Sequence, residues 1–480
     1  MFLFYRAASA PGTFSHLVQA RAIRHTAPSL FAPIFMAYPT VAFTVFFTLA
    51  LLFLHASRRW LSQETAWILL GGIFYGSVHP WLALFLWVYA SVAAVVGKRI
   101  ETTRSKTATL LFVAVAVGLL ALTKYANWGL SLVGELPLWP QWAVPASLSF
   151  ITFQAIWAVL QSYRGEATGV SLRSRMAHIC FFPSLSSGPI VALTQWKNAP
   201  IQEPTQIHEG LARITMGLFQ KLVLASVANI MATTGLQDPS IASSPLLWQS
   251  VLAYSFEIYF DFAGYSNMAI GVALMMGMRL PENFRDPYFA RSIQDFWRRW
   301  HISLSTFFRD NLYIGLFGGN RNGMPRQMLN AIIIMAICGL WHGANTTYIV
   351  WGLLHGAAIA GYVLWKRTGF QLSPWMSLAA TFAFVTYAWI WFRAPSLQEA
   401  LTIQHGLWKP ASDGESPLPW GWWFLTLCAL WLPLERRLQS RAVDFARGVS
   451  RWKTPVWGAA IIVCLALAPR GMPSFIYYQF

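Results

Sequence analysis

Residues 245–280 read PLLWQSVLAYSFEIYFDFAGYSNMAIGVALMMGMRL, and this stretch decides the fold. It is apolar over more than the roughly 20 residues that a helix needs to cross a hydrocarbon core. Similar stretches recur from Val41 to Ala468, and hydrophobic residues make up 56% of the 480 residues whereas charged residues make up 11%. A soluble domain is about a quarter charged, so this chain has too little charge to solvate a globular surface. The sequence therefore predicts an all-α, polytopic integral membrane protein.

We expect a bundle of about 10 to 12 transmembrane helices. The candidate spans are 39–56, 65–78, 81–97, 107–124, 144–163, 208–234, 245–280, 327–343, 347–365, 374–392, 420–434 and 455–470. The spans 65–78 and 420–434 are shorter than a full crossing, which a tilted or sheltered helix tolerates. Residues 181–189 contain two prolines and a glycine that would break a helix. A re-entrant segment that is buried in protein is expected there.

The net charge of +17 reflects membrane topology better than nucleic-acid binding, because the basic residues lie in short segments between apolar spans. The positive-inside rule assigns the basic segments to the cytoplasmic side and the less basic ones to the outside. The cytoplasmic segments are 58–59, 98–106, 164–175, 285–326, 366–367 and 436–453, and the outer ones are 125–143, 235–244 and 393–419. The four cysteines stand singly in apolar surroundings, so neither a metal site nor a disulfide is expected.

Residues 1–35 differ from the rest of the chain. They carry Arg6, Arg21 and Arg24, although the alternation of charge places the start of the first span outside. No clean apolar region with a cleavage site follows these arginines, so a signal peptide fits badly. We expect 1–35 to be an N-terminal extension and 36–480 to be one transmembrane domain.

The strongest candidate for chemistry is His342, in the sequence Gly339-Leu340-Trp341-His342-Gly343-Ala344-Asn345 at the end of an apolar span. A histidine inside membrane helices is a functional hypothesis by default, and imidazole can remove a proton from a hydroxyl near neutral pH. The alternative is a histidine that only hydrogen-bonds a neighbouring helix. That alternative is stronger for His355, on the next span.

Residues 281–326 form the most polar long segment, with Trp297, Arg298, Arg299 and His301 at its centre. Helical spacing would set Trp297, Trp300 and Phe308 to one side, while the arginines suit phosphates or carboxylates. The alternative is an amphipathic helix at the membrane interface with snorkelling arginines and an aromatic belt.

A second polar cluster lies inside the span 245–280. It contains Glu257, Asp261, Tyr265, Ser266 and Asn267. Buried carboxylates are costly unless they are paired, so an interhelical hydrogen-bond network is favoured over direct catalysis. From the residues alone, the chain is an enzyme or a transporter with an intramembrane histidine.

Several motifs in the same order resemble a known family. They are Tyr259-Phe260-Asp261-Phe262-Ala263-Gly264-Tyr265-Ser266-Asn267, Glu282-Asn283-Phe284, Phe296-Trp297-Arg298-Arg299-Trp300-His301, Gly318-Gly319-Asn320-Arg321 and Leu340-Trp341-His342-Gly343-Ala344. Together they resemble the membrane-bound O-acyltransferase (MBOAT) family over most of the chain. Within it, the chain is similar to the bacterial alginate O-acetyltransferase branch, and also to cellulose acetylation and teichoic acid D-alanylation proteins. Gln161 and Ser226 stand where this branch usually has aspartates, which affects substrate detail rather than the reaction class.

The resemblance implies that His342 is the catalytic histidine and that His301 is the second one. Trp297, Arg298, Arg299, Asn345, Asp261 and Tyr265 are the candidates for substrate binding, and no metal is implied. No bound cofactor is expected either, because the acyl donor, acetyl-CoA or another acyl thioester, acts as a substrate.

The same resemblance implies a place and partners. The chain is expected in the bacterial inner membrane as a multi-pass protein, in contact with membrane lipid and without nucleic acid. It would take an acetyl group from a cytoplasmic donor to an exported polysaccharide such as alginate or cellulose, either directly or through a periplasmic acetyltransferase. The alternative function is a polysaccharide export or transporter subunit in which His342 relays protons.

Overall fold

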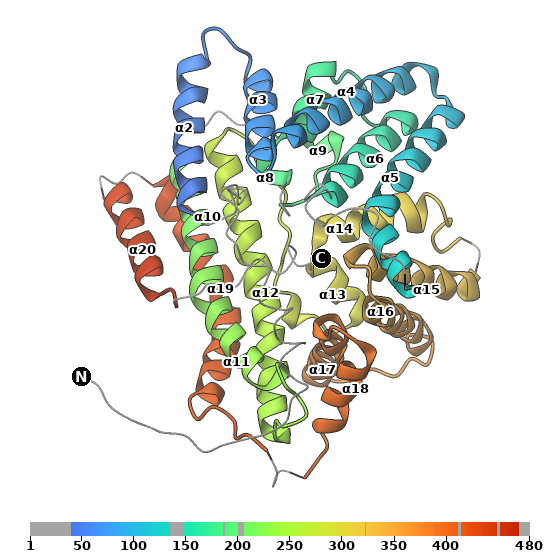
Figure 1. The fold of residues 1–480 in the computed structure, drawn as a ribbon, viewed down its shortest axis with the longest axis vertical. Helices are drawn as coiled ribbons and strands as arrows, with labels where there is room; N and C mark the ends of the chain where they lie inside the picture. The colour runs from blue at the N-terminus through green and yellow to red at the C-terminus, as the bar shows by residue number, and fades with distance from the viewer. Residues whose placement is uncertain are drawn as a thin grey trace, which may run out of the picture.

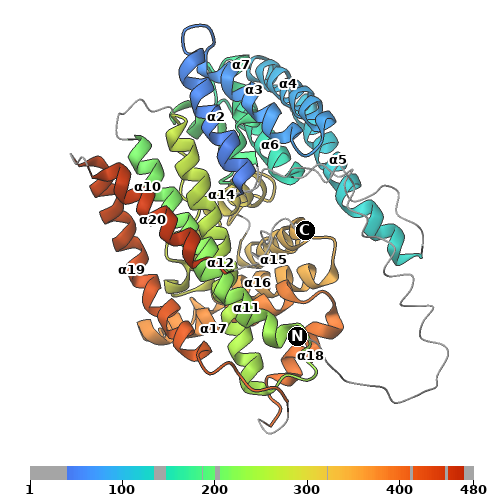
Figure 2. The same cartoon turned by 60° about the vertical axis from the view of Figure 1, so that its left-hand side comes forward.

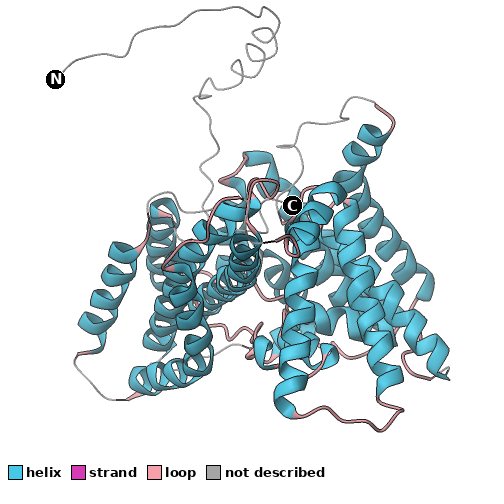
Figure 3. Cartoon of the chain, turned by 90° about the horizontal axis from the view of Figure 1, so that it is seen from below, coloured by secondary structure: helices cyan, strands magenta, loops and turns pink. Residues whose placement is uncertain are grey.

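A computed structural model describes residues 40–134, 147–185, 188–199, 206–321, 323–410, 414–448 and 452–469. Throughout these residues the chain is helical, and the only extended pairing among them is an isolated bridge between Ala242 and Glu415 (Figure 3). The predicted all-α class is confirmed. The predicted extension 1–35 lies outside the described residues and stays a prediction.

The helices of the first half of the chain are α2 (Val41–Ser57), α3 (Gln63–Gly76), α4 (Pro80–Thr103), α5 (Lys106–Leu132), α6 (Leu148–Arg164), α7 (Leu172–Cys180), α8 (Phe182–Leu185), α9 (Leu193–Lys197), α10 (Gln206–Leu218), η2 (Phe219–Ala225) and α11 (Ser226–Leu236). Those of the second half are α12 (Ser244–Met275), η3 (Pro287–Phe289), α13 (Ile293–Arg299), α14 (Ile302–Phe307), η4 (Phe308–Ile314), α15 (Gly323–His342), α16 (Thr346–Trp365), α17 (Pro374–Arg393), α18 (Leu397–Gly406), α19 (Gly421–Arg447) and α20 (Lys453–Leu467). Each predicted span overlaps one of these helices or a continuous run of them, although 245–280 extends beyond the end of α12 and 420–434 covers only the first half of α19.

Six described helical runs are long and apolar enough to cross a membrane. They are Pro80–Thr103, Lys106–Ser131, Gln206–Leu236, Gly323–His342, Thr346–Trp365 and Pro374–Arg393. Val41–Ser57 and Lys453–Leu467 are apolar but shorter. Many of their large apolar side chains face outward, as expected for helices whose solvent is lipid. The chain is therefore a multi-pass membrane protein.

Helix α12 lies at the centre of the molecule, between the early helices and the C-terminal ones (Figures 1 and 2). Its contact with α10 is backbone against backbone, because a Cβ atom added to Gly217 would lie 2.5 Å from the Gly264 carbonyl oxygen. Gly210 and Gly271 make the same kind of contact seven residues away along each helix. Small residues that allow such close approach are the usual means of helix association in membranes.

The described part of the predicted re-entrant segment, 181–185 and 188–189, is not one continuous helix, as its prolines and glycine indicate. The chain leaves α7 at Cys180, forms the single turn α8, and continues through Ile190 and Val191 into α9. Phe181, Phe182 and Ile190 have no exposed surface. This irregular backbone is therefore covered by protein rather than by lipid, as membrane structures require.

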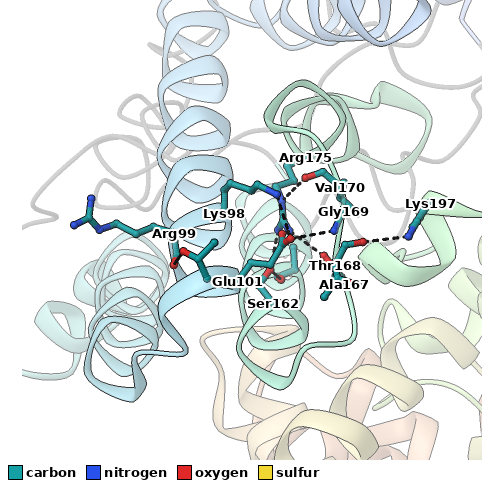
Figure 4. A network of polar contacts seen from close by, with 12 residues as sticks. Lys98, Arg99, Glu101, Ser162, Ala167, Thr168, Gly169, Val170, Arg175 and Lys197 are labelled. Carbon is teal, nitrogen blue, oxygen red and sulfur yellow. Dashed lines mark hydrogen bonds and ion pairs between the residues drawn. The ribbon is translucent and has the colours of Figure 1, made fainter.

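The loop that precedes α7 is fixed by a buried ion pair (Figure 4). Arg175 is 2% exposed, donates to Ser162 Oγ at 2.7 Å, and pairs with Glu101 at the end of α4 at 2.5 Å. Glu101 also accepts hydrogen bonds from the Gly169 backbone and from Lys98. Removing one partner of a buried pair leaves an uncompensated charge, so this network holds 165–171 in one conformation.

The segment 281–326 differs from a single interfacial helix. Its described residues form η3, α13, α14, η4 and the start of α15. Helix α13 ends at Arg299, and His301 adopts a left-handed backbone (φ 42°) before α14 begins. Trp300 and Phe308 are buried, and the half-buried Trp297 packs against the same apolar core. The three aromatic residues thus share a side as predicted, but they face the protein interior. The outward-facing aromatic belt of the alternative interpretation is therefore not found at these three residues.

Candidate active site

His342 is the last residue of α15 and is 4% exposed. The chain must turn there, because α16 packs tightly against α15 and a Cβ atom on Gly343 would lie 2.3 Å from the Tyr348 ring. Asn345 then begins α16: its side chain accepts from the Thr347 backbone at 3.0 Å and donates to the Pro395 carbonyl at 2.7 Å. The Trp-His-Gly-Ala-Asn sequence therefore builds the corner that holds the histidine.

The His342 ring lies among aromatic rings. Its centroid is 4.8 Å from that of Trp341, 5.1 Å from that of Trp351 and 5.0 Å from that of Phe392. These rings come from three helices, so the position of the imidazole is fixed by packing from several sides. Packed surroundings of this kind restrict the rotamer of a reacting group, which is a condition for productive geometry.

Lys124 on α5 reaches the same corner. Its ammonium donates to the carbonyl of Trp341, and to that of His342 at 3.3 Å. These carbonyls belong to the last turn of α15, where the helix provides no internal donors and the macrodipole is negative. A cation there stabilises the end of α15 and holds the backbone of His342 in place.

His301 lies at the start of α14 and is 1% exposed. Its Nδ1 is 3.1 Å from Asn283 Oδ1, which also accepts from the Ser303 backbone N–H. Because that atom accepts from a backbone donor, it is the amide oxygen, and His301 Nδ1 must carry the proton. Burial lowers the pKa of His301 to about 3. The ring is therefore neutral at physiological pH, with the lone pair on Nε2.

The two histidines share one neighbour. The Trp341 ring lies 6.2 Å from His301 and 4.8 Å from His342, measured between centroids. Although 41 positions separate them in sequence, the fold brings both rings to a single indole. Histidine is the side chain used most often for general acid–base catalysis, so this pair of rings is a candidate catalytic site.

The predicted residues near His301 divide into two groups. Trp297 is close to the site, because its Nε1 donates to His355 Nδ1 at 3.3 Å and its ring lies 5.8 Å from that of Trp351. Arg298 is exposed, and Arg299 pairs with Asp295 at 2.9 Å. The fold therefore brings Trp297 to the aromatic site, while Arg298 faces outward and the half-buried Arg299 is held by Asp295.

Asp261 and Tyr265 both lie within α12, where Asp261 forms an ion pair and Tyr265 packs in an apolar cluster. The Asp261 carboxylate forms an ion pair with Lys221, and both side chains are under 7% exposed. Lys221 belongs to η2, a π-helical segment within the run α10–α11, and such segments often mark functional sites. Tyr265 is fully buried in an apolar cluster.

The Asp261 pair has a polar neighbour on α19. Glu435 accepts from Gln220 Nε2 at 2.8 Å and from the Tyr259 hydroxyl at 3.0 Å, while Asn267 donates to Gln220 at 2.7 Å. These bonds connect α12, η2 and α19. The interhelical network that the sequence favoured is present, and it is larger than the five residues in α12 indicated.

Lys124, Asn283 and Glu435 are among the residues of the site and its network that were not selected from the sequence. Lys124 stood at the end of a predicted span, where a snorkelling lysine is ordinary. Asn283 belonged to a recognised motif, Glu282-Asn283-Phe284, but carried no assigned role. Glu435 lay at the start of a basic segment, and no periodicity pointed its side chain into the protein.

No group of three or more metal-ligating side chains occurs among the described residues. A cavity of about 780 Å³ lies between α2, α3, the start of α10 and the end of α12. Its lining includes His55, Arg58, Gln63 and Met276, but neither His301 nor His342. The cavity is therefore separate from the aromatic site.

Taken together, the fold and the site define a polytopic membrane protein with a buried pair of histidines. The family model for MBOAT, the membrane-bound O-acyltransferase family, matches residues 36–397. The chain belongs to this family.

Relatives with stated activities differ in the molecule on which they act. A probable alginate O-acetylase AlgI from Pseudomonas syringae pv. tomato is 37% identical over 341 residues, which is 66% of this chain and 64% of that protein. A peptidoglycan O-acetyltransferase from Helicobacter pylori is 35% identical over a region that covers 55% of this chain and 56% of that protein. A teichoic acid D-alanyltransferase from Bacillus subtilis is 27% identical over a region that covers 62% of this chain and 80% of that protein. The chain thus spans about two thirds of the length of its Pseudomonas syringae relative.

Proposed function

We propose that the chain is an O-acetyltransferase that takes an acetyl group from a cytoplasmic thioester donor, such as acetyl-CoA, for the O-acetylation of an exported polysaccharide. The observation that carries the proposal is the placement of His342 and His301 against one buried indole, at the corner between α15 and α16. Membership of the acyltransferase family and the names of the relatives support the same reaction class.

In the proposed reaction, the oxygen of an acceptor hydroxyl attacks the carbonyl carbon of the thioester. His342 accepts the hydroxyl proton as the C–O bond forms. The C–S bond then breaks, and the leaving thiolate takes the proton from the imidazole. His301 acts beside it as a neutral acceptor at Nε2, in a position set by Asn283. A general base of this kind contributes roughly 10²- to 10⁴-fold to the rate.

The acceptor belongs outside the cytoplasm. Alginate and cellulose are the polymers we propose, and a separate periplasmic acetyltransferase would complete transfer to a long chain. We place the protein in the bacterial inner membrane, where basic segments such as 98–106 face the cytoplasmic donor. Arg298 is exposed in one of these segments and is available to donor phosphates.

Proteoliposomes test the proposal directly. Purified protein is reconstituted with radiolabelled acetyl-CoA on one side and an oligosaccharide acceptor, with and without the periplasmic fraction, on the other. We expect acetyl ester to form only when donor, acceptor and protein are all present. Proton movement without consumption of donor would contradict the proposal and favour a transport or export subunit.

A further inference from the structure

The face of α16 that meets His342 carries buried hydrogen-bond donors without acceptors among the described residues. Trp351 Nε1 and His355 Nε2 have no hydrogen-bond partner, and the two residues are 1% and 0% exposed. They are four positions apart and so lie on the same face of the helix. The hydroxyl of Thr347, one turn earlier, is also buried without a partner.

The protonation of His355 follows from its neighbour. The indole nitrogen of Trp297 can only donate, and it lies 3.3 Å from His355 Nδ1. His355 Nδ1 is therefore the acceptor, and in the neutral ring the proton sits on Nε2. Trp351 and His355 thus offer two neutral N–H groups on one helix face.

Trp351 lies beside the proposed catalytic histidine, and His355 lies beside Trp351. The Trp351 ring centroid is 5.1 Å from that of His342 and 4.8 Å from that of His355. A buried donor without a partner costs about 1–3 kcal/mol, so such groups are uncommon and call for an explanation. Indole nitrogens without a partner also occur at Trp67, Trp391 and Trp457 among the described residues. Trp351 is set apart by its position, because its ring is packed against that of His342. On α16 the two donors share one helix face, and the Trp351 ring lies between those of His342 and His355 in this series of ring contacts.

We propose that Trp351 and His355 donate hydrogen bonds to the acyl carbonyl oxygen during transfer at His342. This inference rests on the proposed function. When the acceptor oxygen attacks, the carbonyl oxygen becomes negatively charged, and two fixed N–H donors stabilise that charge more than they stabilise the neutral thioester. The C–S bond then breaks, the oxygen returns to a carbonyl, and the proton passes from His342 to the thiolate.

Substitutions that remove one N–H but leave a side chain to fill part of the space test this role. Trp351→Phe should lower kcat by about 10²- to 10³-fold at unchanged KM, the loss typical of one donor to an oxyanion. Trp365→Phe, on the same helix but 41% exposed, is the matched control and should behave as wild type. At His355, glutamine can place an N–H near the position of Nε2, whereas phenylalanine cannot. His355→Gln should therefore keep more activity than His355→Phe.

Each outcome has a defined meaning in the proteoliposome assay, with abundance and thermal stability measured for every variant. Wild-type kcat in Trp351→Phe overturns the assignment, and so do equal losses in the two His355 variants. If Trp351→Phe fails to fold, the comparison of the two His355 variants alone tests whether these donors act on the carbonyl oxygen. Wild-type protein without any transfer would instead overturn the proposed function, which separates the two failures.

Discussion

The buried ion pair between Lys221 and Asp261 gives a prediction whose size follows from the structure. Both side chains are under 7% exposed, and they connect η2 to α12. Asp261→Asn leaves a buried ammonium without its counter-charge, and Lys221→Met leaves a buried carboxylate. Breaking such a pair costs about 3–5 kcal/mol. The double variant removes both charges and should lose less than the sum of the single losses, by about 1–3 kcal/mol.

The assay is unfolding in mixed detergent micelles, followed by tryptophan fluorescence, together with acetyl transfer by the same preparations. Asp310→Asn is the control, because the Arg309–Asp310 pair is largely exposed and should contribute under about 1 kcal/mol. If Asp261 only supports the fold, the double variant should regain activity that the single variants lose. Strictly additive losses of stability, or a double variant that is stable but as inactive as Asp261→Asn, would refute this account.

Three further predictions concern the site and its orientation. Lys124→Met should lower both thermal stability and turnover, because the carbonyls at the end of α15 lose a charged donor worth about 1.5–3 kcal/mol. Lys124→Arg should recover part of the stability and part of the turnover. Unchanged thermal stability in Lys124→Met would contradict this role of the lysine. Burial lowers the pKa of His301 to about 3, so below about pH 6.5 the unfolded chain binds a proton that the folded chain does not. The free energy of unfolding of the wild type should therefore fall as the pH drops below 6.5, and that of His301→Asn should fall less. Equal pH dependence of the unfolding free energy in the two proteins would contradict this assignment. Single cysteines in 98–106 and 435–453 should be shielded from an impermeant thiol reagent in intact cells while one in 125–143 reacts, and strong labelling at 98–106 would reverse the orientation.

Sequence predicted the helices well because membrane spans carry a strong and simple signal. The predicted span 347–365 agrees with α16 to within one residue at its start, and 374–392 agrees with α17 to within one at its end. The span 420–434 was too short, since α19 continues through charged residues to Arg447. Charge ends an apolar run but does not end a helix, so hydropathy misses such extensions.

The site was only partly predictable. His342 could be selected because a histidine in an apolar span is uncommon, but its placement against the same indole as His301 depends on how an entire span packs. The left-handed backbone of His301 and the contact with Asn283 carry no periodic signal. Lys124 acts through backbone carbonyls of a distant helix, and such contacts leave no motif in either segment. Pairing across helices is a tertiary property, which local patterns do not specify.

The most direct test of the account is acetyl transfer by His342→Ala in donor-loaded proteoliposomes. His405→Ala, which changes an exposed histidine on α18, serves as the control. We predict that His342→Ala inserts and accumulates like wild type but loses transfer by roughly 10²- to 10⁴-fold, because the acceptor hydroxyl has no base. His405→Ala should remain active. Wild-type turnover by His342→Ala at equal abundance would contradict the central claim that this imidazole carries the reaction.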